Sequence, residues 1–216
     1  MASGDLLSID LTGKGGHASM PHHAVDPIPT ACEIVLALQS LVTRRVDAFD
    51  PVVVSIARVQ AGTTANVIPA TAHLLGTIRT VSERARRAVH EGVHRVVGGV
   101  AAAHQVEAKV HIVEGYPVTV NHEGFARFAQ EVAAELSGSG NVVEMKTPIM
   151  GAEDFSYILQ GVPGAMVFLG VEPPAREPAP LHSNRMVLDE DALSTGIALH
   201  AAVALRFLER GDRPLP

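Results

Sequence analysis

The order of hydrophobic periods along the first half of the chain limits its fold most strongly. Four stretches alternate apolar and polar residues, and two stretches between them repeat apolar residues every three or four positions. The alternating stretches lie at about 7–12, 52–59, 70–80 and 106–112, and the other two at about 27–42 and 85–100. Period-two alternation is typical of half-buried strands, and the longer spacing is typical of amphipathic helices. The order strand–helix–strand–strand–helix–strand predicts a ferredoxin-like fold, with an antiparallel four-stranded sheet and two helices on one face.

Both expected helices carry start signals. Asp26 can cap the first helix, and Pro27 suits its first turn. For the second helix, either Thr80 or Ser82 can act as the cap. Thr80 and Glu83 also fit a capping box, in which each side chain binds a backbone N–H group of the other residue.

From about residue 115 the pattern becomes less regular. The sequence predicts a helix over 123–136, a loop running into a helix start at 150–160, a strand buried on both faces at 165–169 and a last helix over about 189–210. Two or three strands are too few for a parallel sheet covered on both faces. We therefore expect a mixed α/β chain, with a ferredoxin-like domain at 1–114 and a portion of an α/β domain at 115–216.

Composition argues against several classes of function. The 216 residues carry 17 Lys and Arg against 23 Asp and Glu, a net charge of −6 without a long basic run, so nucleic acid and anionic membranes are not expected partners. No stretch approaches the roughly 20 uninterrupted apolar residues of a membrane span, and the first residues lack a secretory pattern. Cys32 is the only cysteine, which excludes an internal disulfide. We expect a cytoplasmic protein, and the 11 histidines direct attention to histidine chemistry.

Three residues of the first half are candidate site residues, each with an ordinary structural alternative. His17 follows glycines that let backbone approach a ligand; its ring could donate to a developing oxyanion, or it could be a surface histidine after a turn. Asn66 could offer its amide to a carboxylate or stabilise its own turn. Arg79 could clamp a carboxylate or form an ordinary ion pair. The residues alone leave these alternatives open.

Two loops of the second half add further candidates. Gly151 and Glu153 lie in Gly-Ala-Glu-Asp-Phe, and His182 lies in Pro-Leu-His-Ser; each follows a strand-like stretch, where α/β folds place their sites. His182 is a suitable metal ligand by type, but catalytic zinc needs about three protein ligands and a water. Neither His22–His23 nor His90–His94 completes such a set convincingly, and the second pair is more typical of a solvated helix face.

Five segments, taken in order, resemble one family. They are Gly-Lys-Gly-Gly-His-Ala-Ser-Met-Pro-His-His-Ala-Val-Asp-Pro at 13–27, Ala-Asn-Val-Ile-Pro at 65–69, Gly-Thr-Ile-Arg-Thr at 76–80, Met-Gly-Ala-Glu-Asp-Phe-Ser-Tyr at 150–157 and Leu-His-Ser at 181–183. Over nearly its whole length the chain resembles the metal-dependent aminoacylase and carboxypeptidase family. Within it, the match is to the amidohydrolase branch of hippurate hydrolases and hydrolases of indole-acetyl-amino-acid conjugates.

The resemblance implies roles for the candidate residues. The ferredoxin-like unit would be a lid and dimerisation domain inserted into an α/β catalytic domain. His17 would reach into the neighbouring subunit's active site and polarise the scissile carbonyl, while Asn66 and Arg79 would hold the substrate carboxylate. Gly151 and Glu153 would belong to a substrate-side loop, and His182 would be the last metal ligand. The implied substrate is an N-acyl amino acid or peptide, the implied partner a second copy of the chain, and the implied cofactor divalent zinc, manganese or cobalt.

The chain also departs from the family pattern. Family members are roughly twice as long, and their N-terminal half carries a His-x-Cys-Gly-His-Asp-type segment and a Glu-Glu pair that provides the general base and a ligand; neither is present here. We therefore expect the lid plus the C-terminal part of the catalytic domain, inactive alone and without tightly bound metal. The alternatives are a non-catalytic dimerisation or carboxylate-binding module and one half of a split enzyme.

Overall fold

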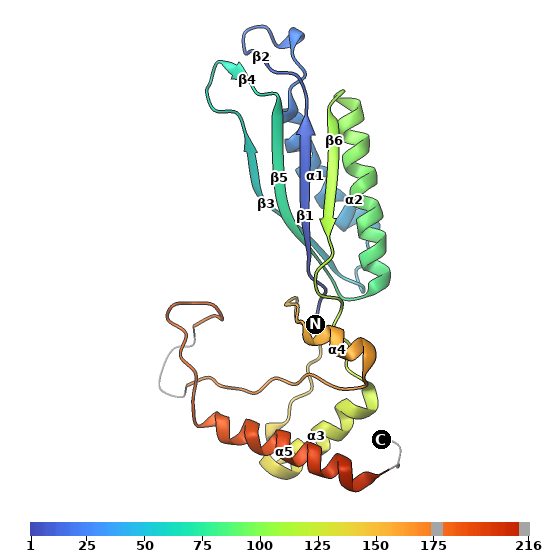
Figure 1. Cartoon of the computed structure of the whole chain (residues 1–216), viewed down its shortest axis with the longest axis vertical. Coiled ribbons are helices and arrows are strands. Elements are labelled where there is room, and N and C mark those ends of the chain that lie inside the picture. The colour runs from blue at the N-terminus through green and yellow to red at the C-terminus, as the bar shows by residue number, and fades with distance from the viewer. Residues whose placement is uncertain (174–178, 212–216) are drawn as a thin grey trace. The chain divides into compact units, whose positions relative to one another are not determined.

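The computed structural model describes residues 1–173 and 179–211 and divides into two compact units (Figure 1). The first unit is Met1–Thr119 with Thr147–Tyr157, and the second is Val120–Lys146 with Ile158–Pro216. The first unit is therefore larger than the expected 1–114 domain. The 147–157 segment joins it because the Ala2 N–H donates to the carbonyls of Ile149 and Gly151, at 3.1 and 3.0 Å.

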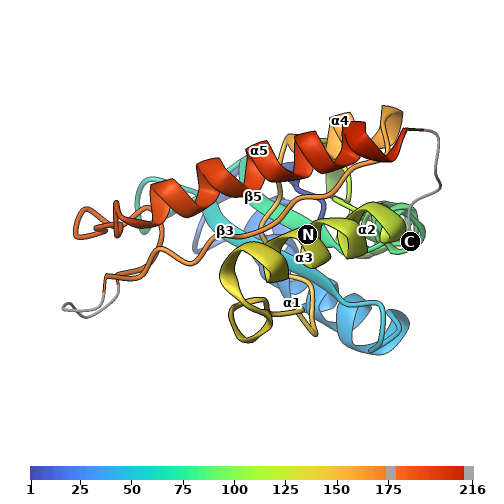
Figure 2. The ribbon, with the colours of Figure 1, turned by 90° about the horizontal axis from the view of Figure 1, so that it is seen from below.

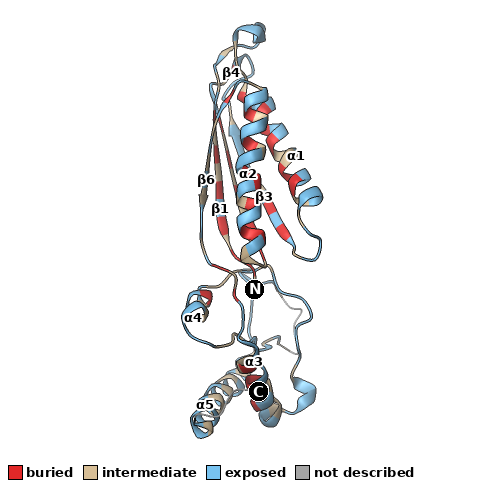
Figure 3. Ribbon diagram, turned by 90° about the vertical axis from the view of Figure 1, so that its right-hand side faces the viewer, coloured by how far each residue is buried: buried red, intermediate tan, exposed pale blue. Residues whose placement is uncertain are grey.

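The first unit contains the ferredoxin-like fold that the sequence predicts. Its antiparallel sheet has the order β3–β5–β1–β6. The strands are β1 (Asp5–Thr12), β3 (Val52–Ala61), β5 (Thr71–Thr80) and β6 (Glu107–Val113). Two helices, α1 (Pro27–Arg45) and α2 (Glu83–Ala103), cover one face of this sheet (Figure 3). The mixed α/β class is confirmed.

The hydrophobic core of this unit lies between the sheet and the two helices. It forms because alternate strand residues and one stripe of each helix are apolar. Its largest fully buried apolar side chains are Leu7, Ile9, Leu11, Ile34, Leu38, Leu74, Ile78, Val89, Val93 and Val97. Burying each side chain of this size contributes about 1.5–3 kcal/mol, so the packing holds the sheet and helices as one body.

The structure shows which residues cap α1 and α2. Asp26 accepts a hydrogen bond from the Ile28 N–H at 2.9 Å, as expected. Ser82, not Thr80, caps α2 and accepts from the Ala85 N–H at 3.0 Å. Thr80 is instead the last residue of β5, where its hydroxyl lies 2.7 Å from that of Ser3. The capping box does not form because a residue in the strand ladder cannot also start the helix.

A short antiparallel ribbon that the sequence did not predict follows β1. It pairs β2 (Gly16–His17) with β4 (Val67–Ile68). The 3-10 turn η1 (Pro21–His23) follows β2 in the chain. The preceding glycines serve close backbone packing: a Cβ on Gly13 would lie 2.1 Å from the Val25 carbonyl oxygen. We call this pair the β2–β4 ribbon.

The second unit is built on α3 (Glu123–Ser137) and α5 (Ala192–Arg210), with the 3-10 turn η2 (Ser139–Asn141) after α3. α4 (Phe155–Gly161) runs across the boundary between the two units. α3 and α5 pack side by side (Figure 2), and the ring centroid of Phe207 lies 5.8 Å from that of Phe125 and 6.2 Å from that of Phe128. Each helix was predicted, although α5 begins at Ala192 rather than near 189.

The strand expected at 165–169 does not form, and residues 115–173 and 179–211 contain no other strand. A strand needs a neighbour to complete its backbone hydrogen bonds. Here one side chain takes that place: the Met166 N–H donates to Asn121 Oδ1 at 2.9 Å, and Asn121 Nδ2 donates to the Met166 carbonyl at 3.0 Å. Val167 and Phe168 are exposed rather than buried. Residues 174–178, between this segment and His182, lie outside the described part of the chain.

Among the described helices, α5 is the one whose length and composition would suit a membrane span. One such helix is weak evidence for a membrane span: although α5 has no buried residue, it packs on α3, with Arg206 paired to Glu135 at 2.5 Å. This property therefore does not identify α5 as a transmembrane helix.

Candidate functional site

The β2–β4 ribbon brings His17 and Asn66 together. His17 pairs with Val67 in the ribbon, and the Ala18 N–H donates to the Asn66 carbonyl at 3.1 Å. Both side chains are exposed. Two of the predicted site residues are thus neighbours on a backbone held by strand pairing.

The ring of His17 has a defined partner. Its Nδ1 accepts from the Ser19 N–H at 3.1 Å and lies 2.8 Å from the Ser19 hydroxyl. Asn66 is held in a similar way, because the Thr64 hydroxyl donates to Asn66 Oδ1 at 3.2 Å. Both site side chains are therefore anchored by a residue two positions away in the sequence.

Arg79 lies in a second group of predicted residues. It is half-buried, one residue before the end of β5. A Cβ on Gly4 would lie 2.6 Å from Arg79 Nη1 and 3.0 Å from the Ala152 Cβ, so the guanidinium lies close to the 151–153 segment. Within that segment, the Glu153 carbonyl accepts from the Ser156 hydroxyl at 2.6 Å.

The two groups lie at opposite ends of the sheet. The ribbon adjoins the beginning of β5, and the eight-residue separation from Thr71 to Arg79 corresponds to about 27 Å of strand. Figure 1 shows β2 and β4 at the end of the sheet far from the N-terminus. One chain therefore does not bring Asn66 and Arg79 to the same carboxylate, as their expected shared role requires.

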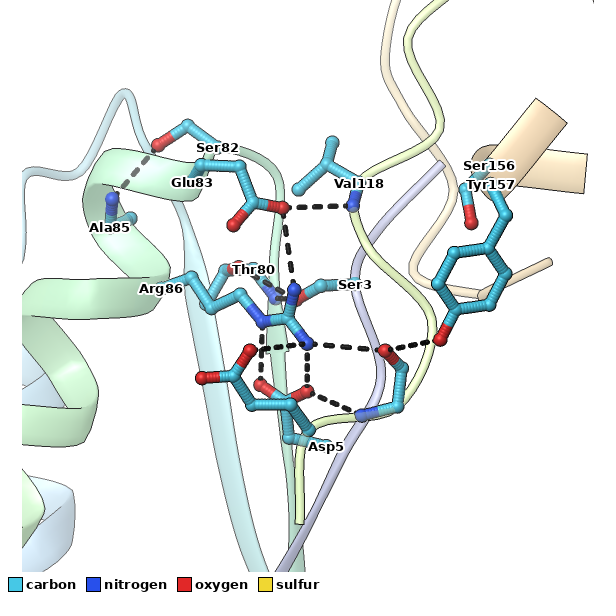
Figure 4. Close-up of polar contacts among 12 residues, drawn as sticks. Ser3, Asp5, Thr80, Ser82, Glu83, Ala85, Arg86, Val118, Ser156 and Tyr157 are labelled. Carbon is cyan, nitrogen blue, oxygen red and sulfur yellow. Dashed lines mark hydrogen bonds and ion pairs between the residues drawn. The ribbon is translucent and has the colours of Figure 1, made fainter. Parts of the chain in front are cut away.

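A buried polar cluster, which the sequence analysis missed, lies at the start of β1 (Figure 4). Asp5 accepts from Arg86 Nε and Nη2, at 3.0 and 2.5 Å, and from the Gly115 N–H at 3.1 Å. His90 Nε2 lies 2.8 Å from the same carboxylate. The Gly115 carbonyl accepts from Arg86 and from the Tyr157 hydroxyl, at 3.3 and 3.2 Å. The cluster fixes the chain leaving β6 against the start of β1.

The charges of this cluster stabilise each other. Burial by itself raises the pKa of the Asp5 carboxyl, but the hydrogen bonds from Arg86, His90 and Gly115 outweigh it and hold that pKa below its ordinary value. The hydrogen bond to Asp5 raises the pKa of Arg86. The signal in the sequence is a charged residue in phase with Leu7 and Ile9 of β1. The expectation of a solvated face fails for His90, which is half-buried.

His182 lies in the second unit, is exposed and has φ of 66°. Within residues 1–173 and 179–211 no group of three His, Cys, Asp or Glu side chains is arranged to hold a metal. His22 and His23 stack on each other, with ring centroids 4.1 Å apart. The described residues therefore do not by themselves fit the implied metal.

Comparison with known proteins gives one consistent family. Residues 14–206 match the description "Peptidase family M20/M25/M40". The chain is 35% identical to IAA-amino acid hydrolase ILR1-like 4 of Arabidopsis thaliana, covering 96% of this chain and 48% of the relative. It is 35% identical to the hippurate hydrolase of Campylobacter jejuni, covering 97% and 54%.

A solved structure shares both sequence and fold. The Bacillus subtilis YXEP protein, described as a dinuclear metal binding peptidase from the M20 family, is 34% identical and superposes with a TM-score of 0.77 over 97% of this chain and 51% of that one. The chain thus spans about half the length of the relatives it matches.

Proposed function

Because the chain belongs to peptidase family M20/M25/M40, we propose that it supplies the lid and substrate-holding half of a metal-dependent hydrolase of N-acyl amino acids. Two relatives, a hippurate hydrolase and an IAA-amino acid hydrolase, are named for cleavage of such amides. The observation that carries the proposal is the arrangement of polar side chains that suit this substrate class. His17 and Asn66 lie together on the β2–β4 ribbon, and Arg79 lies beside the 151–153 segment.

An N-acyl amino acid presents an amide carbonyl and a carboxylate. His17 donates a hydrogen bond to the carbonyl oxygen, where negative charge develops when water attacks the amide carbon. The carboxylate binds the guanidinium of Arg79 and the amide of Asn66. His182 would supply one ligand if the completed enzyme binds the implied metal. The base that takes the proton of water and the other ligands come from the remaining half of the enzyme.

The geometry of the sheet favours a homodimer. Asn66 and Arg79 are separated by most of the length of β5 in one chain. If both bind one carboxylate, they belong to different copies, with His17 and Asn66 reaching the site of the partner. A two-fold dimer built this way contains two equivalent sites, each completed by the other copy.

The decisive experiment measures hydrolysis of N-acetyl and N-benzoyl amino acids with zinc, manganese or cobalt. The chain is assayed alone and after co-expression with the remaining half of a relative such as the hippurate hydrolase. We expect background rates alone, because the general base and most metal ligands are missing, and metal-dependent turnover with both halves. Metal-dependent hydrolysis by the chain alone would overturn the incomplete-enzyme reading, and inactivity of a folded two-half complex would overturn the proposed activity.

The dimer has its own test. His17→Ala chains and Arg79→Ala chains are each expected to be impaired when completed by the remaining half. Mixed together, they form hybrid dimers in which one site has the native His17 of one copy and the native Arg79 of the other. Partial recovery of turnover is expected, and a mixture no more active than either variant would contradict the shared site. Sedimentation that shows only monomer at high micromolar concentration would also contradict it.

A further inference from the structure

The two ribbon residues, His17 and Asn66, each have a hydroxyl residue two positions away whose hydrogen bond defines which of their atoms can donate. Ser19 follows His17, and Thr64 precedes Asn66. Both bonds lie within the β2–β4 ribbon and its adjoining loops. Both are formed by residues of this chain alone.

For His17, the bond fixes the tautomer. A backbone N–H can only donate, so the ring nitrogen it meets, Nδ1, must carry the lone pair. The Ser19 hydroxyl, 2.8 Å from the same nitrogen, acts as a second donor. The proton of the neutral ring therefore resides on Nε2, which leaves Nε2–H as a hydrogen-bond donor. In this tautomer Nε2 has no lone pair. It can therefore donate to an oxygen acceptor but cannot bind a metal ion.

For Asn66, the bond fixes the orientation of the amide. The Thr64 hydroxyl donates to Oδ1 at 3.2 Å, so the amide oxygen of Asn66 faces Thr64. The Nδ2 amino group is then the part of the side chain offered to a ligand, with two N–H bonds. Both neighbours thus occupy the acceptor of the site residue and leave its donor for the ligand.

We infer that Ser19 and Thr64 are positioning residues that turn the β2–β4 ribbon into a pair of hydrogen-bond donors, His17 Nε2–H and Asn66 Nδ2–H₂. Two donors with their acceptors already occupied suit a ligand that offers only oxygen acceptors, such as a carboxylate or a developing oxyanion. The identity of that ligand rests on the proposed function. The donor arrangement rests on the hydrogen bonds of this chain alone.

The first test reads the tautomer directly in the 216-residue chain. Long-range ¹H–¹⁵N correlation spectra distinguish the two neutral tautomers of each histidine, and His94, exposed on α2, serves as the internal reference. We expect His17 to show the Nε2–H form alone at alkaline pH, whereas His94 shows an average of both forms. An averaged or Nδ1–H signal for His17 would overturn the inference, whatever the activity of the protein.

The second test removes each hydroxyl. Ser19→Ala keeps the backbone N–H donor and removes the hydroxyl donor, so part of the His17 population is expected to move to the Nδ1–H form; Ser19→Thr restores the hydroxyl and the Nε2–H form. Thr64→Val keeps the shape of the side chain but loses the donor, so the Asn66 amide is expected to show more rotational averaging. Ser40→Ala, exposed on α1, is the matched control and changes neither signal. Unchanged His17 and Asn66 signals in these variants would refute the positioning roles.

The third test measures how the two donors, His17 Nε2–H and Asn66 Nδ2–H₂, affect catalysis in the enzyme completed with its remaining half. Ser19→Ala loses one hydrogen bond, so we expect kcat to fall about 3- to 10-fold. KM should change little, because His17 acts on the developing oxyanion and not on the bound substrate. Thr64→Val instead raises KM, since Asn66 binds the carboxylate. Unchanged kinetics in both variants would overturn the positioning roles. A completed enzyme without amidohydrolase activity, but with the expected tautomer, would refute the proposed function and leave the donor pair supported.

Discussion

Asp5 and Arg86 form the contact of the first unit that is most sensitive to a single substitution. Their side chains are 0% and 6% exposed, so Asp5→Asn removes the buried counter-charge of Arg86 and leaves it the more exposed carboxylates of Glu83, at 3.4 Å, and Glu114, at 3.9 Å. We expect a loss of about 3–5 kcal/mol in the free energy of unfolding, measured by urea denaturation at neutral pH. Asp10→Asn is the matched control: its carboxylate is 49% exposed beside His73, and its loss is expected to cost less than about 1 kcal/mol. Equal losses in the two variants would contradict this assignment.

The same carboxylate makes stability depend on pH. Burial raises the pKa of Asp5, but the hydrogen bonds of the cluster outweigh it and lower that pKa in the folded chain. The stabilising contribution is therefore present above the ordinary carboxyl pKa of about 4, and it is lost as pH falls through the folded pKa. The urea midpoint of the native chain is expected to fall more steeply below about pH 4 than that of Asp5→Asn. Parallel pH profiles would show that Asp5 does not carry this dependence.

At the scale of the elements, replacing a glycine by alanine is expected to have opposite effects on stability at two positions, Gly76 and Gly98. A Cβ on Gly76 of β5 would lie 2.2 Å from the Ser55 carbonyl oxygen of β3, beside the register shift between Ile56 and Arg58. Gly76→Ala is expected to destabilise the first unit by about 1–3 kcal/mol, because the strands must move apart. Gly98→Ala, where no atom lies within 4 Å on the exposed side of α2, is expected to stabilise it by about 0.5–1 kcal/mol. Thermal unfolding of both variants measures the contrast, and a shift of the same sign in both would contradict it.

Elements with their own hydrophobic period could be predicted from the sequence, and elements that depend on a distant partner could not. The strands and helices of the first unit follow their periods closely, as β1 and α2 show. The β2–β4 ribbon is too short to have a period, and 165–169 has the composition of a buried strand without a strand beside it. Likewise, motifs identified His17, Asn66 and Arg79, but only the register of the sheet shows that they form two separate groups.

The whole molecule consists of two units that bury their apolar residues to different extents. In the first, α2 has seven buried residues, including Val89, Val93 and Val97. In the second, α5 has no buried residue, and Leu193, Ile197 and Leu208 are 63%, 71% and 75% exposed (Figure 3). Helical stability comes mainly from packing of the apolar face. The amides of α5 are therefore expected to exchange with solvent faster than those of α2, as measured by hydrogen–deuterium exchange. Equal protection of the two helices would contradict this difference.

Binding of the proposed remaining half is expected to change amide exchange in the second unit only. The exposed side chains of α5 and the 165–169 segment, which has no neighbouring strand, present apolar surface and backbone groups that a catalytic domain would normally cover. If the remaining half completes that domain, exchange is expected to slow at α5 and at 165–169, since the segment gains a strand partner. The amides of α2, already packed in the first unit, are expected to keep their rates and act as the internal control. Slower exchange confined to α2, or no slowing at all in an active complex, would show that the proposed remaining half docks on another surface.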